Sequence, residues 1–318
     1  MSSDLASDSG RVYTNRQLLR RHPEDSTFDI FKAESCGKTF VLKKVPKGVF
    51  ERSQHIAKDL PSVPQLRMHV DSKLEDCTLI YDYFQGTLLE LLEKDSSLLP
   101  DERLKIMRAV GEAVQKLHSR NWIHTDIKPD NIFLDWTSDK NGNKVITKVA
   151  LGDFDIACQL DANQVRITPH AVGNVMWRSP EAQTGMAIKP IDIYSLGLVY
   201  LYALGAGELI IIPRERLQEG IIPEQEVIIQ HFSYFGPVPE SLYEQIHDEK
   251  WRKPLRLASE VAEKEVAARP GLRFEIWGDQ TGKTYVDLIA GMTNLDPKTR
   301  SRIDEVLAHP YWKECLTY

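Results

Sequence analysis

Eight consecutive residues, His124 to Asn131, hold the densest set of reactive side chains in the chain. The segment carries a carboxylate at Asp126, an ammonium group at Lys128 and an amide at Asn131. Phosphoryl transfer needs these three groups, because an Asp deprotonates the attacking hydroxyl, a Lys neutralises the moving phosphate and an Asn holds a metal ion. The residue types and their spacing therefore indicate phosphoryl-transfer chemistry.

The same segment resembles the catalytic loop of protein kinases, H-R-D-x-x-x-x-N, with Thr125 in place of the Arg. Leu151 to Asp155 resembles the metal-binding D-F-G motif, with Asp155 in place of the Gly. Met176 to Glu181 resembles the A-P-E motif at the end of the activation segment, with Ser179 in place of the Ala. Motifs in the family's order support one another more strongly than any single match does.

Two further motifs in the C-terminal half extend the resemblance. Asp192 to Gly197 is similar to the start of the buried helix of the large lobe, whose Asp holds the backbone of the catalytic loop in that family. Leu295 to Arg300, followed by Ala308 to Pro310, is similar to the last helical pair, whose Arg pairs with the Glu of A-P-E, here Glu181. The motifs together cover about residues 120–310.

The resemblance implies an α+β, bilobal protein-kinase-like fold. A small β-sheet lobe with one helix is expected over residues 11–84, and a larger, mainly helical lobe over residues 85–318. They would form a single protein kinase domain of about residues 11–315, after a disordered Ser/Asp-rich stretch at residues 1–10. The length exceeds the usual single-domain size, which fits a two-lobed domain.

The composition, 42% hydrophobic and 27% charged residues, is typical of a soluble globular protein. A net charge of −6 favours neither nucleic acid nor an anionic membrane as a partner. No apolar run approaches the ~20 residues that span a bilayer, and the N-terminus has no signal-peptide pattern. The four scattered cysteines indicate reduced thiols. We therefore expect an intracellular protein, cytoplasmic or nuclear. The kinase resemblance implies that it acts on a protein substrate.

The elements that must position the motifs follow from hydrophobic periodicity and composition. Helices are predicted at 50–60, from residue 88 onward and at 101–120, and strands at 16–21, 28–34, 38–45, 66–70 and 79–84. In the 101–120 segment, Leu104, Met107 and Val110 recur at helical spacing, so this helix would deliver the catalytic loop. The chain after it is expected to be mostly helical, with six prolines interrupting residues 205–285.

The resemblance assigns roles to four polar residues. Asp126 would accept the proton of the substrate hydroxyl, and Lys128 would contact the transferred phosphate. Asn131 and Asp153 would hold Mg²⁺, or Mn²⁺, through hard oxygen ligands. The alternatives are an Asp that stabilises a turn, a surface Lys and purely structural polar contacts. His124 is expected to pack and to form hydrogen bonds.

Phe40 to Lys43 resembles the V-A-I-K strand, which makes Lys43 the expected contact to the α- and β-phosphates of ATP. Val41 stands where an Ala contacts adenine, so the roof of the pocket would be tighter. The acidic partner of Lys43 stays open. Glu51 lies close in sequence for a strand-to-helix crossing, whereas Asp59 has the better spacing but a shorter side chain, and we favour Asp59.

Tyr81 to Phe84 would form a hinge whose backbone grips adenine, with a plain edge strand as the alternative. Asp82 and Phe84 in this segment, together with Phe133 after the catalytic loop, are therefore expected to bind the nucleotide.

Three departures from the family pattern bear on activity. No Gly lies between Arg11 and Glu34, so the loop whose backbone amides approach phosphates is missing, and His22 to Thr27 places two acids there. These acids repel a triphosphate, which predicts weak ATP binding or a loop that stays open. Asp155 either restricts backbone rotation or adds negative charge near the metal ions. Thr125 replaces the Arg that meets a phosphorylated loop, so activity is expected not to depend on loop phosphorylation.

Three functions compete. The leading one is an active Ser/Thr protein kinase, because Lys43 and the three other chemistry-bearing polar residues are all present. Gly173 to Arg178 supports it by resembling a Ser/Thr-type substrate platform, with Asn174 where a Thr bridges to the catalytic Asp. A pseudokinase scaffold is the alternative, motivated by the missing glycines. A small-molecule kinase is disfavoured by the A-P-E-like motif and Arg300. Gly278 to Thr284 resembles a Walker A loop but is one residue short.

Overall fold

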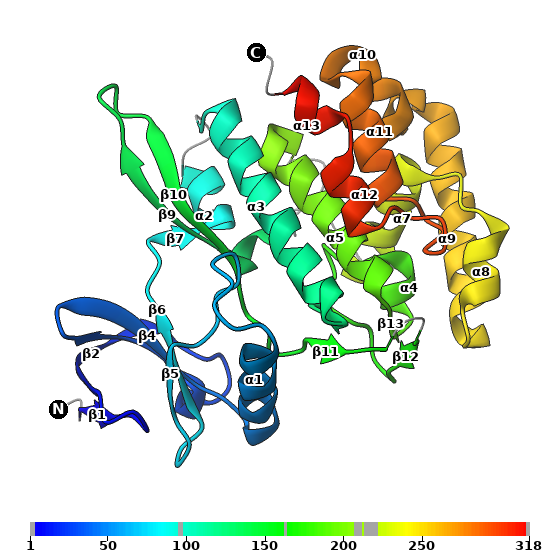
Figure 1. Cartoon of the computed structure of the whole chain (residues 1–318). Coiled ribbons are helices and arrows are strands. Elements are labelled where there is room, and N and C mark those ends of the chain that lie inside the picture. The colour runs from blue at the N-terminus through cyan, green and yellow to red at the C-terminus, as the bar shows by residue number, and fades with distance from the viewer. Residues whose placement is uncertain (1–3, 95–97, 162–163, 207–211, 213–221, 316–318) are drawn as a thin grey trace.

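The computed structural model describes residues 4–94, 98–161, 164–206, 212 and 222–315. It has the predicted α+β architecture, with an antiparallel sheet in the N-terminal part and a larger helical part (Figure 1). The chain passes from the sheet to the helices after β6 (Thr78–Asp82). A long hairpin of β9 (Ile132–Ser138) and β10 (Lys144–Leu151) projects from the helical part (Figure 1).

The small-lobe sheet has six antiparallel strands in the order β1-β2-β3-β4-β6-β5. Their bounds are Leu5–Ala6, Val12–Arg20, Ile30–Ser35, Lys38–Lys44, Thr78–Asp82 and Asp71–Lys73, in that spatial order. Phe40 and Leu42 pack on one face of the sheet, while Val41 packs on the other with Tyr81 and with Phe50 of α1 (Lys47–Asp59). Because side chains alternate along a strand, Lys43 shares the face of Val41.

The segment before β2 is ordered from residue 4 onward, so the prediction of disorder over residues 1–10 is wrong for residues 4–10. β1 pairs with β2, and Leu5 is buried in the sheet core. The hydroxyls of Ser7 and Ser9 donate to the Asp71 carboxylate at 2.6 and 2.7 Å. One buried apolar side chain and two hydrogen bonds to a carboxylate thus hold a stretch whose composition alone indicates disorder. Residues 1–3 lie outside the described residues.

The strand predicted at 66–70 is absent from the structure, and β5 forms the edge of the sheet instead. Leu66 makes an isolated parallel bridge to Leu151 and packs in the core of the large lobe. The backbone N–H of Arg67 donates to the Leu151 carbonyl at 2.8 Å. The segment therefore packs with the large lobe and does not join the small-lobe sheet, because Leu66 is buried in the large lobe and Arg67 bonds to β10.

A second sheet, of three antiparallel strands, lies where the sequence predicted mostly helix. Its order is β10-β9-β7, with bounds Lys144–Leu151, Ile132–Ser138 and Gly86–Thr87. The turn between β9 and β10 is closed by Asp139, whose carboxylate accepts the N–H groups of Asn141 and Asn143, both at 2.8 Å. Gly142 has a φ of +83° there. Asn141-Gly142 is a hairpin signal that could have revealed this element from the sequence.

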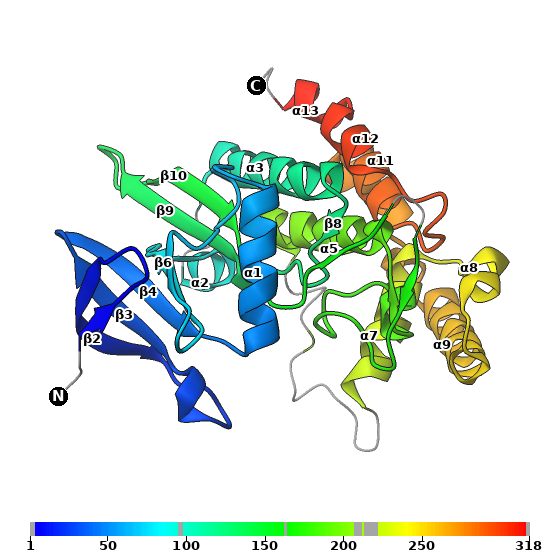
Figure 2. The same cartoon turned by 60° about the horizontal axis from the view of Figure 1, so that its bottom comes forward.

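The large lobe packs its helices around α5 (Lys189–Leu201), which is buried nearly all round (Figures 1 and 2). The amphipathic α3 (Pro100–Ser119) lies against it and leads into the catalytic loop. The other helices are α2 (Leu88–Lys94), α4 (Pro180–Gln183), α7 (Pro223–Phe235), α8 (Glu240–Gln245), α9 (Glu249–Ala268), α10 (Gly278–Thr281), α11 (Lys283–Met292), α12 (Ile303–Ala308) and α13 (Tyr311–Glu314). Two short strand pairs complete the lobe, β8 (Trp122–Ile123) with β11 (Cys158–Gln159) and β12 (Arg166–Ile167) with β13 (Met186–Ala187).

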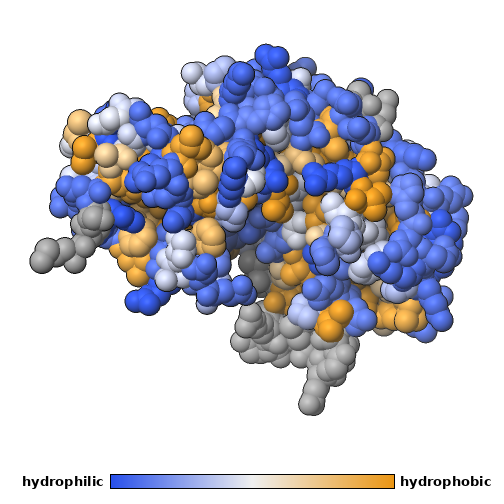
Figure 3. Space-filling view, turned by 90° about the horizontal axis from the view of Figure 1, so that it is seen from below, coloured by the Kyte–Doolittle hydropathy of each residue, from blue (hydrophilic) through white to orange (hydrophobic). Residues whose placement is uncertain are grey.

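The proline-rich region predicted at 205–285 contains α7, α8 and α9 as separate helices, and residues 207–211 and 213–221 lie outside the described residues. All four cysteines are free thiols. Within the described ranges, no helix combines the length and apolar character needed to cross a bilayer. Polar side chains cover most of the face in Figure 3, with hydrophobic residues in scattered patches between them.

Candidate active site

The predicted catalytic loop, His124 to Asn131, is held in place by Asp192, which lies near the start of α5 and is 1% exposed. Its two carboxylate oxygens accept the backbone N–H groups of His124 and Thr125, each at 2.8 Å, and His118 bonds to it at 2.9 Å. The predicted contact between this Asp and the loop backbone is thus present. The loop is thus anchored to α5, a helix that is buried nearly all round.

His124 links the catalytic loop to the D-F-G-like segment. Its Nδ1 accepts the N–H of Asp126 at 3.3 Å, so Nε2 carries the proton that is donated to the Gly152 carbonyl at 3.0 Å. The ring packs against Phe154 with centroids 5.0 Å apart. The imidazole is fully buried and both nitrogens are engaged, which gives it the structural role expected from the sequence.

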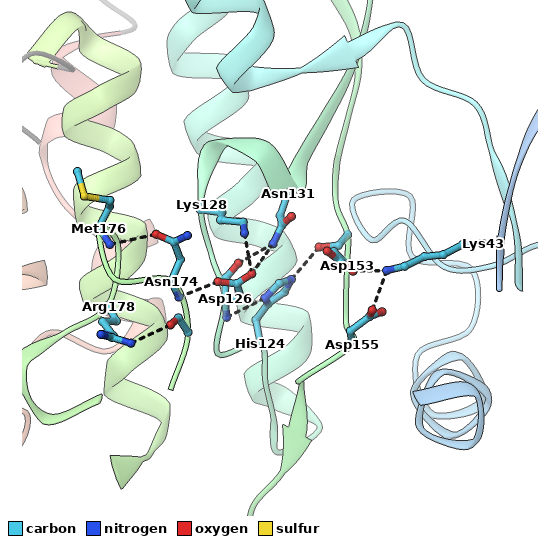
Figure 4. Close-up of polar contacts among 12 residues, drawn as sticks. Lys43, His124, Asp126, Lys128, Asn131, Asp153, Asp155, Asn174, Met176 and Arg178 are labelled. Atoms are coloured by element: carbon cyan, nitrogen blue, oxygen red, sulfur yellow. Dashed lines mark hydrogen bonds and ion pairs between the residues drawn. The ribbon is translucent and has the colours of Figure 1, made fainter. Parts of the chain in front are cut away.

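The Asp126 carboxylate is held by three groups (Figure 4). Its Oδ1 accepts the backbone N–H of Asn174 at 3.0 Å. Its Oδ2 lies 3.1 Å from the Lys128 ammonium and 3.1 Å from the Asn131 amide nitrogen, which also bonds to the Asp126 carbonyl at 2.8 Å. Asp126, Lys128 and Asn131 are therefore brought together as the spacing implied.

The expected bridge from the Asn174 side chain to Asp126 is not formed, because the side-chain oxygen accepts the N–H of Met176 at 3.0 Å. The backbone N–H of Asn174 makes the bridge to the carboxylate instead. A main-chain donor at this position needs no particular side chain, which is why the residue type misled the sequence interpretation.

Two site residues have backbone conformations that L-residues rarely adopt. Thr125 has a φ of +68° and Asp153 a φ of +65°. The Thr125 hydroxyl donates to the Ile156 carbonyl at 3.0 Å, and a Cβ at Gly173 would lie 2.3 Å from the Thr125 carbonyl oxygen. Backbone strain of this kind persists only where the surroundings hold it, and it gathers at functional sites.

Lys43 reaches across from β4 to the D-F-G-like segment (Figure 4). Its ammonium lies 2.6 Å from Asp153 and 2.8 Å from Asp155. Burial acts to lower the pKa of Lys43, but the two carboxylates outweigh it and raise the pKa above its ordinary value. Burial acts to raise the pKa of Asp153, and the nearby ammonium outweighs it and lowers that pKa. Burial and the Asp153 charge together raise the pKa of Asp155, against the effect of Lys43.

Neither acid considered as the partner of Lys43 contacts it, so the preference for Asp59 is wrong in this structure. Asp59 accepts the indole N–H of Trp122 at 3.0 Å and lies 3.5 Å from His55. Glu51 pairs with Lys47 at 3.8 Å, on the exposed side of α1. Asp155 takes the place of the helix acid beside Lys43. Counting residues from Lys43 to the next helix could not have identified it, because Asp155 is not on that helix.

The α1 helix still reaches the site, through Arg52. Its guanidinium donates to the backbone carbonyl of Asp155. The helix thus holds the main chain of Asp155 while the Asp155 side chain holds Lys43, in place of a direct contact between a helix acid and the lysine.

The donor set for a metal ion is small. No cluster of three or more His, Cys, Asp or Glu side chains suited to a metal occurs among the residues that the structure describes. Mg²⁺ is usually held by one or two protein oxygens, phosphate oxygens and water. Asn131 directs its amide nitrogen at Asp126, which leaves its amide oxygen for a metal, and Asp153 offers a carboxylate. The two residues fit Mg²⁺ carried by a triphosphate.

The predicted base site is aromatic. Val41 is buried and pairs in register with Tyr81, and the rings of Phe84 and Phe133 lie 6.0 Å apart. The sequence interpretation missed Arg67, whose guanidinium lies among these rings and donates to the Asp82 carbonyl. The sequence offered one signal for it, because Arg67 is a charged residue within the mainly apolar segment 66–70 that was predicted as a strand.

The loop between β2 and β3 replaces the missing glycine-rich loop and uses its amides internally. His22 Nδ1 accepts the N–H groups of Glu24 and Asp25 at 3.3 and 3.1 Å. The Asp25 carboxylate accepts the N–H of Thr27 at 2.8 Å, and Asp29 accepts that of His22 at 2.7 Å. These amides are thus not free to bind phosphate in this conformation.

Comparison with known proteins gives a consistent match. A model of the protein kinase domain matches residues 36–312. The serine/threonine-protein kinase PrkC of Bacillus subtilis is 36% identical over 41% of this chain and 19% of its own length. The phosphorylase b kinase gamma catalytic chain, liver/testis isoform, of Mus musculus is 23% identical over 83% of this chain and 54% of its own. A serine/threonine-protein kinase of Drosophila yakuba is 24% identical over 99% of this chain and 37% of its own. The chain thus spans about half or less of the length of these relatives.

Proposed function

Because the chain belongs to the protein kinase domain family, we propose that it transfers the γ-phosphate of ATP to a serine or threonine hydroxyl of a protein substrate. The observation that carries the proposal is the Asp126 carboxylate, held by Lys128, Asn131 and the Asn174 backbone. A carboxylate held by three donors has a defined orientation, and a general base acts only within hydrogen-bond reach of the proton that it accepts.

The proposed reaction breaks one P–O bond and forms another. The substrate hydroxyl loses its proton to Asp126 while its oxygen bonds to the γ-phosphorus, and the bond from that phosphorus to the bridging oxygen breaks to release ADP. Lys128, 3.1 Å from Asp126, would neutralise charge on the transferred phosphoryl group. Bound Mg²⁺ would offset the negative charge of the phosphates. Asn131 and Asp153 would hold that ion, and Lys43 would contact the α- and β-phosphates.

The Ser/Thr class rests on three observations. Lys128 lies two residues after Asp126, as in Ser/Thr-type catalytic loops, and Gly173 to Arg178 resembles the corresponding substrate platform. Two of the relatives above are named serine/threonine-protein kinases. In this chain the platform bonds directly to the base through Asn174.

A pseudokinase scaffold is the second candidate, and specific contacts favour it. The amides of the loop between β2 and β3 are used within the loop, and the Arg67 guanidinium lies in the predicted base site. Both features reduce nucleotide binding without removing the groups that do the chemistry. Mg²⁺-dependence of nucleotide binding separates the candidates, because a scaffold binds ATP without metal or not at all.

The direct test is transfer of radiolabelled γ-phosphate to a generic Ser/Thr protein substrate with Mg²⁺ or Mn²⁺. Asp126→Asn should lower the rate by about 10²–10⁴-fold, the usual contribution of a general base. Asp130→Asn is the matched control, because Asp130 is an exposed acid in the same loop. Transfer by the wild-type protein and the control, but not by Asp126→Asn, would establish the kinase. No transfer by folded wild-type protein would favour the scaffold.

A further inference from the structure

Arg67 lies at the junction of the two lobes, directly after Leu66. Its backbone N–H bonds to the Leu151 carbonyl, so its main chain follows β10. Its side chain reaches the predicted hinge, Tyr81 to Phe84. Both Nε and Nη2 donate to the carbonyl oxygen of Asp82, at 3.3 and 3.0 Å. That oxygen belongs to the segment expected to grip adenine.

Aromatic rings surround the guanidinium. Its Cζ lies 4.1 Å from the Phe133 ring centroid, 4.9 Å from that of Tyr81 and 5.7 Å from that of Phe84. A planar guanidinium stacks on ring faces much as a flat base does. The group therefore uses the aromatic surface of Phe133 and the carbonyl of Asp82 together, the two features that would receive a purine.

The Arg67 cation has no acidic partner to hold it in place. No carboxylate in the described part of the chain forms an ion pair with it. Burial lowers the pKa of Arg67 to about 10, and the charges of Tyr81, Asp153 and Asp82 oppose this effect only in part. The side chain is half-buried and has no counter-ion in the described part of the chain, so its position depends on one carbonyl and the ring faces. A long, flexible side chain held in this way can be displaced.

Arg67 and Phe133 also pack closely around Gly152. A Cβ added at Gly152 would lie 3.0 Å from Arg67 Cβ and 3.0 Å from the edge of the Phe133 ring. Gly152, Arg67 and Phe133 are thus already in close contact. A purine that stacks on the same ring and bonds to the same carbonyl would meet the guanidinium.

We propose that the Arg67 side chain occupies the base position of the nucleotide site and competes with the purine, so that Arg67 sets the nucleotide affinity of this chain. The inference rests on the proposed function, because the base site is assigned by that proposal. A ligand that binds only when Arg67 has withdrawn has an affinity reduced by the fraction of molecules in the open state. Removing the guanidinium should therefore raise the nucleotide affinity.

The test is direct binding to the full chain, with adenosine and Mg-ATP as probes in isothermal titration calorimetry. Adenosine has no phosphate, so it reports on the base site without the β2–β3 loop, Lys43 or catalysis. Arg67→Val should tighten the binding of both probes by at least about tenfold. Arg67→Met keeps an unbranched stem and lacks the donors to Asp82, and it should tighten binding several-fold. Melting temperatures without ligand show that each variant is folded.

Arg256→Val is the matched control. Arg256 stacks on Tyr243 at 4.1 Å, the same distance as Arg67 on Phe133, but it lies on α9 and pairs with Glu240. This variant should bind both probes as the wild-type protein does. Affinities of Arg67→Val and Arg67→Met that equal or fall below the wild-type value would overturn the proposal, as would absence of binding in all of them.

Failure of this inference differs from failure of the proposed function. Phosphate transfer that Asp126→Asn abolishes, with adenosine affinity unchanged in both Arg67 variants, would reject the role of Arg67 and keep the kinase. Tighter adenosine binding in these variants, with no transfer by any of them, would keep the role of Arg67 and reject the kinase.

Discussion

Lys43 forms an ion pair with Asp155, the residue that stands where the family motif has Gly, at 2.8 Å. The two residues lie far apart in sequence: Lys43 is on β4, and Asp155 lies four residues after the end of β10. A second carboxylate, Asp153, lies 2.6 Å from the same ammonium, and no acid of α1 contacts it. Asp155, which replaces the Gly of the D-F-G motif, thus supplies the counter-ion for Lys43 that no acid of α1 provides.

Replacing Asp155 should therefore lower activity. In Asp155→Asn and Asp155→Gly, Lys43 keeps only Asp153, which is also the expected metal ligand, so one carboxylate must serve two cations. We expect kcat/KM to fall by about tenfold, equivalent to about 1.4 kcal/mol in the barrier. Steady-state phosphate transfer measures this, with Asp130→Asn as the control. Higher turnover in Asp155→Gly would show that Asp155 is inhibitory and would contradict its role as the counter-ion of Lys43.

The contacts that could be predicted from the sequence join residues of one motif, or residues of two motifs that always contact each other in this family. Asp126, Lys128 and Asn131 meet because a single tight loop carries them, and Asp192 bonds to that loop as expected. The bilobal fold was predicted for the same reason, since the order of the motifs fixes the order of the elements.

The parts that could not be predicted depend on long-range geometry. The partner of Lys43 was sought on the next helix, whereas the structure brings in Asp155 from after β10. Arg67 was read only as part of a strand at 66–70, because its contacts with Phe133 and Asp82 depend on the path of the backbone between the lobes. Ordering of residues 4–10 depends on Asp71, more than sixty residues away in sequence.

Removing Glu181 should destabilise the large lobe. Glu181 and Arg300 form a bidentate pair at 2.5 and 3.2 Å, and both side chains are fully buried. Among the described residues, Glu181→Ala leaves the Arg300 cation with the carbonyls of Pro190 and Asn294 and the face of Tyr194. Removing one member of a buried pair costs about 3–5 kcal/mol of unfolding free energy. Urea unfolding measures this loss.

The exposed pair of Arg302 and Glu305 provides the control for that measurement. Glu305→Ala also removes the hydrogen bond that this carboxylate accepts from the Arg302 N–H at the start of α12, so it should cost about 0.5–2 kcal/mol, still less than loss of the buried pair. Equal losses in Glu181→Ala and Glu305→Ala would mean that burial of the Glu181–Arg300 pair has no energetic consequence.

Asp25→Gly should strengthen Mg-ATP binding several-fold. Hydrogen bonds from Thr27 lower the pKa of Asp25, so this carboxylate is ionised near the expected phosphate site. The substitution removes a charge that repels a triphosphate and frees the Thr27 N–H. Titration calorimetry with Mg-ATP measures the change, and Glu75→Gly, at an exposed turn of the same lobe, is the control. An affinity that falls, or rises equally in both variants, would reject a specific effect of this loop.

His231 should make the stability of the large lobe depend on pH. It lies on α7, fully buried, and neither ring nitrogen has a hydrogen-bond partner in the described part of the chain. The ring packs between Tyr194 and Phe235, with centroids 5.6 and 6.2 Å away. Burial lowers the pKa of His231 to about 3. The folded protein therefore keeps this imidazole neutral where the unfolded chain, with a pKa of about 6.5, binds a proton.

The sign of the effect follows from proton uptake. Between about pH 6.5 and 3 the unfolded state binds more protons at this site, so the unfolding free energy falls as the pH falls, by up to about 1.4 kcal/mol per pH unit. His231→Phe removes this contribution, and its unfolding free energy should decline less between pH 7 and pH 5 than that of the wild-type protein. Urea unfolding at several pH values measures the slopes, and His247→Gln, at an exposed site, should keep the wild-type slope. A His231→Phe slope equal to that of the wild-type protein would show that His231 binds protons equally in the folded and unfolded states, and would contradict the lowered pKa.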